Sequence, residues 1–139
     1  MRLEKVKILV GTDVQAIDEV ARSMTQFGER YTRRLFTDHE IECCGENPVT
    51  AAPGLAARFA AKEAVLKILD STATVPTWKS IEVQRGARGV PKIVLRFEAA
   101  DLARDQDIEN ISLSLSHGGG IASAVVVAQV AESGPEALS

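Results

Sequence analysis

The chain has 139 residues, a formal net charge of −3 at pH 7, 45% hydrophobic residues and 25% charged residues. This length and balance suit a single compact domain, and the negative charge does not favour binding to nucleic acid or to an anionic membrane surface. No apolar run approaches the roughly 20 residues that a membrane-spanning helix needs, and no signal-peptide apolar region precedes the first strand. We therefore expect a cytoplasmic protein that binds neither nucleic acid nor membrane.

The pattern of apolar residues and turn signals predicts an α+β fold. In chain order, the expected elements are a strand at residues 5–10, a helix at 17–33, a capped short helix from 38 to just before 45, a long helix at 54–70, strands at 80–84 and 92–97, a short helix near 99–104, and strands at 112–116 and 121–130. Because the later strands come as hairpins, we expect a mainly antiparallel sheet with the long helix and the other helices packed on one face. Residues 1–130 are predicted to form one domain, and residues 131–139 a loose tail.

The first strand leads into Gly-Thr-Asp at residues 11–13, the first candidate for a site. Asp13 would lie just past the end of the strand, and the preceding glycine allows the backbone to come close to a ligand. A turn aspartate, or an N-cap for the helix that begins near Ile17, explains the same residues without any function. Taken alone, Asp13 favours this simpler interpretation.

The long helix predicted at residues 54–70 carries a carboxylate and an ammonium on one face. Glu63 and Lys67 are four residues apart and point the same way, and alanines on that side leave room for another group. An ordinary surface ion pair has the same spacing, with Arg58 and Lys62 as solvated charges. The motifs on either side of this helix in the sequence are needed to decide between the two interpretations.

Near the end of the chain, residues 111–117 alternate apolar and polar side chains at a period of two, which is typical of a half-buried strand with one polar face. Ser116 and His117 close this strand, and three glycines at residues 118–120 follow. Successive backbone N–H groups in such a segment can bind an anion. A flexible hairpin turn with an exposed histidine is the alternative.

Together, these segments resemble a known family. Gly-Thr-Asp at 11–13, Arg-Phe-Ala-Ala-Lys-Glu-Ala at 58–64 and Ser-Leu-Ser-His at 114–117 resemble, in order and separation, the motifs of holo-acyl-carrier-protein synthases, the short bacterial type of 4′-phosphopantetheinyl transferase. Phe-Thr-Asp-His-Glu at 36–40 and Gly-Val-Pro at 89–91 fit as well. The resemblance covers nearly the whole chain and implies the 4′-phosphopantetheinyl transferase fold.

The activity that this resemblance implies is transfer of 4′-phosphopantetheine from coenzyme A to a serine of an apo acyl carrier protein, or of a carrier domain in a larger synthase, as used in fatty acid and lipid biosynthesis. By the same resemblance, Asp13 and Glu63 would bind Mg²⁺, which prefers oxygen ligands, with waters and the co-substrate coenzyme A completing its coordination. Glu63 would also help to remove the serine proton. Lys67 would stabilise charge on the transferred phosphoryl group or on the leaving phosphate.

Four further residues stand at positions that lie near the nucleotide in this family: Arg58, Pro91, Ser116 and His117. Arg58 and His117 suit the 3′-phosphate of coenzyme A, and Pro91 would lie beside the adenine end. Members of the family form homotrimers with the cleft between subunits, and we expect the same here.

Two departures from the family pattern affect these expectations. Leu9 stands where many relatives have a glycine, which would alter packing only. Asp18 and Glu19 stand where relatives usually offer arginine to an acidic carrier protein, and like charges disfavour such a contact. Either the carrier docks differently, or the partner is not the usual fatty-acid carrier.

Two other classes of function were weighed against the transferase. A non-catalytic module that binds coenzyme A or a carrier protein would not need Asp13, Glu63 and Lys67 together. A serine hydrolase would need His117 to activate a serine, but Ser116 and His117 are adjacent on a strand and point to opposite faces. The sequence also has no Gly-x-Ser-x-Gly motif. The transferase is therefore the preferred prediction, with the binding module as the alternative.

Overall fold

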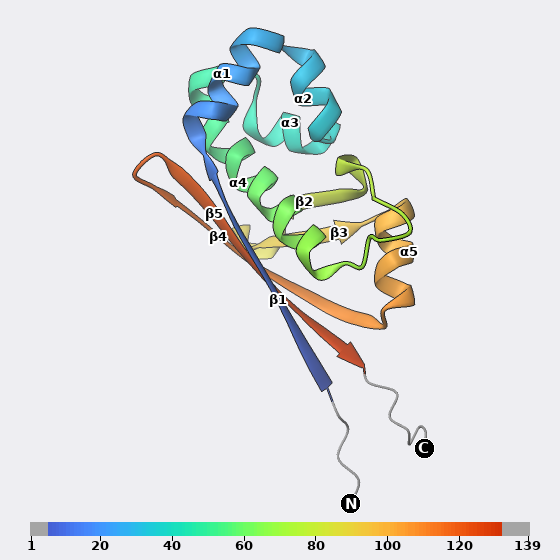
Figure 1. The fold of residues 1–139 in the computed structure, drawn as a ribbon. Helices are drawn as coiled ribbons and strands as arrows, with labels where there is room; N and C mark the ends of the chain where they lie inside the picture. Colours follow the sequence, from blue (N-terminus) through green and yellow to red (C-terminus); the bar gives the residue numbers. More distant parts are fainter. Residues whose placement is uncertain (1–5, 132–139) are drawn as a thin grey trace, which may run out of the picture.

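The computed structural model describes residues 6–131 of the chain. Figure 1 shows the long helix α4 lying against a three-stranded sheet, with the short helices α1, α2 and α3 gathered near one end of it. The elements are β1 (Val6–Ala16), α1 (Ile17–Phe27), α2 (Glu29–Leu35), α3 (Asp38–Cys44), α4 (Pro48–Ile68), β2 (Ile81–Arg85), β3 (Pro91–Leu95), α5 (Phe97–Asp105), β4 (Ile108–Gly118) and β5 (Ile121–Ala131), with 3₁₀ turns at Trp78–Ser80 and Ala87–Gly89. None of the helices in this part of the chain is long and apolar enough to cross a membrane.

The strands form two sheets rather than one. The larger sheet has the order β1-β5-β4, and the smaller sheet pairs β2 with β3. Every pairing within residues 6–131 is antiparallel. The α+β class, the antiparallel pairing and the long helix packed on the sheet are therefore confirmed, whereas the single sheet is corrected to two sheets that meet where β3 contacts β4.

Helix α4 begins six residues earlier than predicted. The side chain of Asn47 accepts hydrogen bonds from the N–H groups of Val49 and Thr50, at 2.9 and 3.3 Å, and so caps the helix. Pro48 occupies the first helical position, where a missing N–H costs nothing. Pro53, one residue before the predicted start, lies inside α4.

Two other boundaries also differ from the prediction. Strand β1 does not end at Val10 but continues to Ala16, because β5 pairs with it along its whole length. The helix predicted at residues 17–33 is split at Gly28, whose φ of +59° is a left-handed conformation that glycine adopts readily. The first predicted residue of β1, Lys5, and the predicted tail beyond Ala131 lie outside the described residues.

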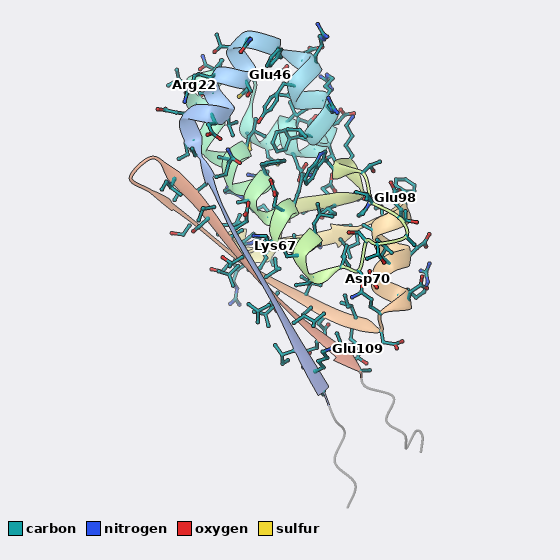
Figure 2. The ribbon with its side chains drawn as sticks, viewed as in Figure 1. Arg22, Glu46, Lys67, Asp70, Glu98 and Glu109 are labelled. Carbon is teal, nitrogen blue, oxygen red and sulfur yellow. The ribbon has the colours of Figure 1, made fainter. Side chains whose placement is uncertain are left out.

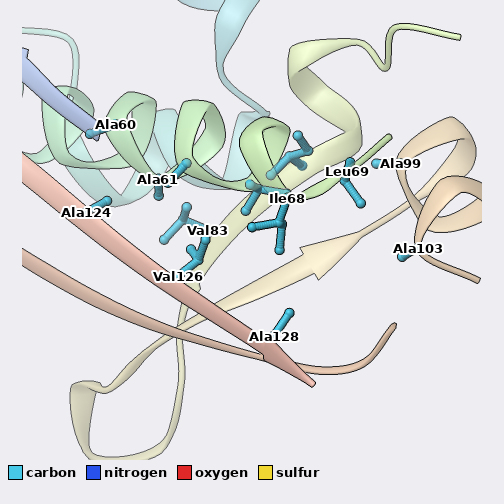
Figure 3. Packing of buried hydrophobic residues seen from close by; sticks show 13 residues of the cluster. Ala60, Ala61, Ile68, Leu69, Val83, Ala99, Ala103, Ala124, Val126 and Ala128 are labelled. Atoms are coloured by element: carbon cyan, nitrogen blue, oxygen red, sulfur yellow. The ribbon is translucent and has the colours of Figure 1, made fainter. Parts of the chain in front are cut away.

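Small side chains dominate the contact between α4 and the large sheet. Figure 3 shows Ala61 and Ile68 of α4 close to Val126 and Ala128 of β5, with Val83 of β2 in the same cluster. A second cluster fills the space between α4 and the short helices and includes Val20, Met24, Phe36 and Leu55. Helix α4 is thus enclosed on more than one side, and this placement decides which of its charged residues reach solvent.

Candidate functional site

Asp13 and Lys67 meet where β1 crosses α4. The Nζ atom of Lys67 lies 3.1 Å from Oδ1 of Asp13 and donates a hydrogen bond of 2.7 Å to the backbone oxygen of Thr12. The Lys67 side chain is 53% exposed and that of Asp13 is 19% exposed, so the pair lies at the surface. Figure 2 shows Lys67 on α4 beside β1. Asp13 lies inside the strand, not past its end as predicted.

Glu63 completes this group, one helical turn before Lys67. Partial burial raises the pKa of Glu63 above its ordinary value, the nearby charge of Asp13 raises it further, and Lys67 opposes both effects. A cation bound between the two carboxylates would relieve the repulsion that makes ionisation of Glu63 unfavourable. We call Asp13, Glu63 and Lys67 the carboxylate site.

A backbone contact sets the spacing of the carboxylate site. A Cβ atom added to Gly11 would lie 2.3 Å from the backbone oxygen of Ala64, far inside contact distance. Glycine is therefore required at this position, as the sequence indicated, although the partner is a helix backbone and not a ligand. This contact holds β1 close enough to α4 for Asp13 to reach Lys67.

Lys62 is not the solvated charge that one interpretation of the sequence allowed. Its side chain and that of Glu40 are both 0% exposed, and Nζ of Lys62 lies 2.8 Å from Oε1 of Glu40. Lys62 also donates to the backbone oxygens of Trp78, at 3.0 Å, and Ile81. Desolvation lowers the pKa of Lys62, while Glu40 acts in the opposite direction.

The side chain of Glu40 makes contacts at the N-terminal cap of α3 and with β2 and α4. Its carboxylate accepts hydrogen bonds from the N–H of Thr37 at 2.9 Å and from the N–H of Val83 at 2.7 Å, in addition to Lys62. Thr37 and Glu40 form the capping box that the sequence predicted for α3. The two residues Glu40 and Lys62, which we call the buried ion pair, connect α3, α4 and β2, and each of their buried side-chain polar atoms has a hydrogen-bond partner.

Arg58 faces a different side of α4 from the carboxylate site. Five residues separate it from Glu63, which corresponds to about 140° around the helix axis. Arg58 lines a cavity of about 410 Å³, which we call the Arg58 pocket. Among the residues around this pocket are Arg58 of α4, Gln84 and Arg85 of β2, Pro91 of β3, and Ser114 and Leu115 of β4. The structure thus brings the predicted residues Arg58 and Pro91 together.

Ser116 and His117 are not part of this pocket. Both are exposed near the end of β4, where Ser116 pairs with Ser123 and His117 pairs with Ala122. Side chains alternate along β4, so His117 shares the face of Leu115 and Ser116 shares the face of Ser114, and both Leu115 and Ser114 line the Arg58 pocket. The predicted nucleotide-binding residues are therefore divided between the pocket and the end of the β4–β5 hairpin.

Sequence reasoning missed two features near these sites. It did not identify Arg85, because a single arginine before a turn carries no signal of a pocket. It also did not pair Glu40 with Lys62, because these residues are far apart in the chain and each had a simple local explanation. The capping-box spacing did mark Glu40 as structurally important, but it gave no sign of a partner on α4.

The donor set of the carboxylate site suits a hard cation with oxygen ligands. Asp13 and Glu63 contribute carboxylates, and the ion pair with Lys67 uses Oδ1 of Asp13, which leaves Oδ2 for another partner. No group of three or more histidine, cysteine or acidic residues placed to bind a metal occurs within residues 6–131. Mg²⁺ fits such a site, because it commonly takes one or two protein carboxylates and obtains its other ligands from water and phosphate.

Known proteins resemble this chain over most of its length. Residues 9–126 match the model of the 4′-phosphopantetheinyl transferase superfamily. The holo-[acyl-carrier-protein] synthase of Maridesulfovibrio salexigens is 38% identical over 120 residues, which cover 85% of this chain and 94% of that protein.

Solved structures of similar proteins have the same fold. The acyl carrier protein synthase of Mycobacterium tuberculosis is 32% identical, with a TM-score of 0.68 over 91% of this chain and 100% of that one. The holo-[acyl-carrier-protein] synthase of Helicobacter pylori, in complex with coenzyme A, is 26% identical, with a TM-score of 0.71 over 86% of this chain and 99% of that one.

Proposed function

The chain belongs to the 4′-phosphopantetheinyl transferase superfamily, and from this premise we propose that its carboxylate site performs the transfer reaction. The chain is a holo-[acyl-carrier-protein] synthase: it transfers 4′-phosphopantetheine from coenzyme A to a serine of an apo acyl carrier protein. The observation that carries the assignment of the site is the contact of Lys67 with Asp13 beside Glu63. The alternative of a non-catalytic binding module is not favoured.

Asp13 and Glu63 are the residues that would hold Mg²⁺. The mutual repulsion of their carboxylates supports this role, since it raises the pKa of Glu63 and would be relieved by a cation. When bound, the ion neutralises charge on the pyrophosphate oxygens of coenzyme A. A cytoplasmic location and a role in fatty acid biosynthesis belong to the same proposal.

The remaining chemistry is assigned to Glu63 and Lys67. The serine oxygen of the carrier attacks the phosphorus next to the pantetheine arm, a serine O–P bond forms, and the P–O bond to adenosine 3′,5′-bisphosphate breaks. Glu63 accepts the serine proton, directly or through a water molecule. Lys67, one turn along α4, stabilises the charge that develops on the transferred phosphoryl group or the leaving phosphate.

The nucleotide of coenzyme A is assigned to the Arg58 pocket and the nearby hairpin end. Arg58 and His117 suit the 3′-phosphate, and Pro91 suits the adenine. Ser116, beside His117 near the end of β4, is assigned to the same nucleotide. The carboxylate site and the Arg58 pocket lie on different sides of α4, so one chain offers the two halves of the site on different sides.

The outer face of the large sheet supports a homotrimer with shared sites. Large apolar side chains on this face are exposed, among them Val10 63%, Val14 62%, Ile8 52%, Val125 41% and Val127 37%. Contiguous exposed apolar surface of this kind marks a contact with another protein. We assign it to contacts between copies of this chain, which would bring the carboxylate site of one subunit to the Arg58 pocket of the next. Light scattering that gave the mass of a monomer would contradict this assignment.

The transferase assignment is tested by intact-protein mass spectrometry. Candidate apo carrier proteins and isolated carrier domains are incubated with this chain, coenzyme A and Mg²⁺. A mass gain of one phosphopantetheine, lost with a chelator and with Asp13→Ala, is the expected result, and the carrier that gains it is the partner. No gain on any carrier, with coenzyme A still bound, would favour the binding module instead.

Sharing of the site between subunits is tested by mixing two inactive variants. Glu63→Ala disables the carboxylate site and Arg58→Ala disables the Arg58 pocket, so neither variant alone should transfer phosphopantetheine. In randomly mixed trimers, about a quarter of the sites combine an intact half from each variant, and about that share of activity should return. If co-refolded mixtures stay inactive while each variant still assembles, the site lies within one chain.

A further inference from the structure

The Arg58 pocket carries positive charge that no residue around it neutralises. Arg58 and Arg85 both line it, and no aspartate or glutamate does so within the part of the chain that the structure describes. Neither arginine forms an ion pair in this range. Two unpaired guanidinium groups in one concave site form a binding place for an anion.

Arg58 shows that the pocket is prepared for a ligand. The residue is only 7% exposed, and its Nε atom is buried without a hydrogen-bond partner. One terminal nitrogen donates to the backbone oxygen of Gly54 at 3.3 Å, which holds the side chain in place. A buried donor without a partner costs free energy, and a ligand oxygen would remove that cost.

Arg85 approaches the same site from β2. The charges of Arg58 and Arg85 both lower the pKa of the Cys44 thiol, although burial, the largest effect, raises it. The two cations thus act on the same thiol in the same direction. Arg85 ends the strand that pairs with β3, and its register partner is Pro91, which also lines the pocket.

We infer that Arg85 is a specificity-determining residue, which together with Arg58 binds the 3′-phosphate of coenzyme A and so distinguishes coenzyme A from 3′-dephospho-coenzyme A. This inference rests on the proposed function. Coenzyme A has two anionic centres, and the pyrophosphate is required at the carboxylate site, on another side of α4. The 3′-phosphate, a monoester with a charge of about −1.5 to −2, remains for the two arginines. A volume of about 410 Å³ is within the range of small-molecule sites.

Arg88 provides a matched control for Arg85. It lies three residues later, in the 3₁₀ turn between β2 and β3, is exposed, and does not line the pocket. The same Arg→Gln substitution at both positions changes net charge equally. Any difference between the two variants then reports the position of the guanidinium group and not the charge of the loop.

The test measures binding of two nucleotides to the full chain by calorimetry. Adenosine 3′,5′-bisphosphate carries the 3′-phosphate, and adenosine 5′-monophosphate lacks it. We expect Arg85→Gln to weaken binding of the bisphosphate about ten- to hundredfold, as for loss of a charge-assisted hydrogen bond, and to leave the monophosphate unchanged. Arg88→Gln should change either affinity by less than about twofold, as for a rim charge screened by salt. In transfer assays, Arg85→Gln should raise KM for coenzyme A, but not for 3′-dephospho-coenzyme A, with kcat retained.

The results separate this inference from the proposed function. If Arg85→Gln weakens binding of both nucleotides equally, or of neither, the role of Arg85 is overturned even if transfer occurs. If Arg85→Gln selectively weakens binding of the bisphosphate but the protein transfers no phosphopantetheine, the inference is supported and the transferase function is refuted. Arg85 is exposed, and an unchanged melting temperature of its variant shows that the fold is intact.

Discussion

Lys62 and Lys67 lie on the same helix and each contacts a carboxylate, yet their surroundings differ completely. The Lys62–Glu40 pair is fully buried, and backbone groups of three elements complete its hydrogen bonds. The Lys67–Asp13 pair lies at the surface beside Glu63, whose pKa is raised by burial and by Asp13. The comparison shows that α4 uses one ion pair to connect elements and leaves the other accessible from solvent.

Burial explains why the two pairs take different roles. A buried ion pair gains little net stability over an apolar contact, but loss of one partner leaves an uncompensated charge. An exposed pair contributes about 0–1 kcal/mol to stability and remains accessible to ligands. The same substitution at the two lysines should therefore affect two different properties of the protein.

The largest expected effect is on stability. Lys62→Met removes the cation from Glu40 and should lower the free energy of unfolding by about 3–5 kcal/mol, measured by urea denaturation at fixed protein concentration. The double variant Glu40→Gln/Lys62→Met removes both charges and should recover part of this loss. A loss below about 1 kcal/mol in the single variant would show that the pair does not hold the elements together.

The next effect is on catalysis. Glu63→Gln should lower kcat for transfer about 10²- to 10³-fold, in the range for loss of one group that acts on the transition state. Stability should stay the same or rise slightly, because the raised pKa means that ionised Glu63 is unfavourable in the folded protein at neutral pH. Unchanged transfer and unchanged dependence on Mg²⁺ would refute both roles assigned to Glu63.

Lys67→Met is the direct counterpart of Lys62→Met. It should lower transfer about tenfold to a hundredfold, less than Glu63→Gln, because this lysine is partly solvated. Its free energy of unfolding should change by less than about 1 kcal/mol. If Lys67→Met unfolded the protein as readily as Lys62→Met, the distinction between the two pairs would be wrong.

The smallest expected effect is a shift of the pH dependence of transfer with Mg²⁺ concentration. The roles proposed for Glu63 require its ionised form, so the rate of transfer should fall as pH decreases through the raised pKa of this residue, above the ordinary value of 4.5. Mg²⁺ binds the ionised form, so higher Mg²⁺ should move this acid limb to lower pH. The measurement is the pH dependence of transfer at two Mg²⁺ concentrations with coenzyme A saturating. If the acid limb of the pH dependence does not move with Mg²⁺ concentration, Glu63 does not bind the metal.

The sequence predicted the α+β class and placed Glu63 and Lys67 on one face of a helix, and the structure shows them beside Asp13. Their catalytic roles remain predictions. The sequence could not show that Lys62 is buried and Lys67 exposed, because α4 is enclosed on several sides. Periodicity separates faces only when one face meets solvent.

Two other errors in the prediction arose at glycines. Gly11 suggested that a strand ends, but it lies in the middle of β1 because α4 leaves no room for a side chain. Gly28 splits a helix whose apolar pattern predicts continuity. In both cases the deciding contact or conformation is a property of the folded backbone, and the local sequence does not contain it.

The contact of Gly11 with Ala64 has a consequence for how this enzyme can change over evolution or be redesigned. The main chains of β1 and α4 touch directly there, so the separation of the two carboxylates does not depend on the size of core side chains. Apolar residues elsewhere in the core can be exchanged for others of similar volume while Asp13 and Glu63 keep their spacing. Position 11, in contrast, accepts no side chain at all, and an alanine there would separate the strand from the helix.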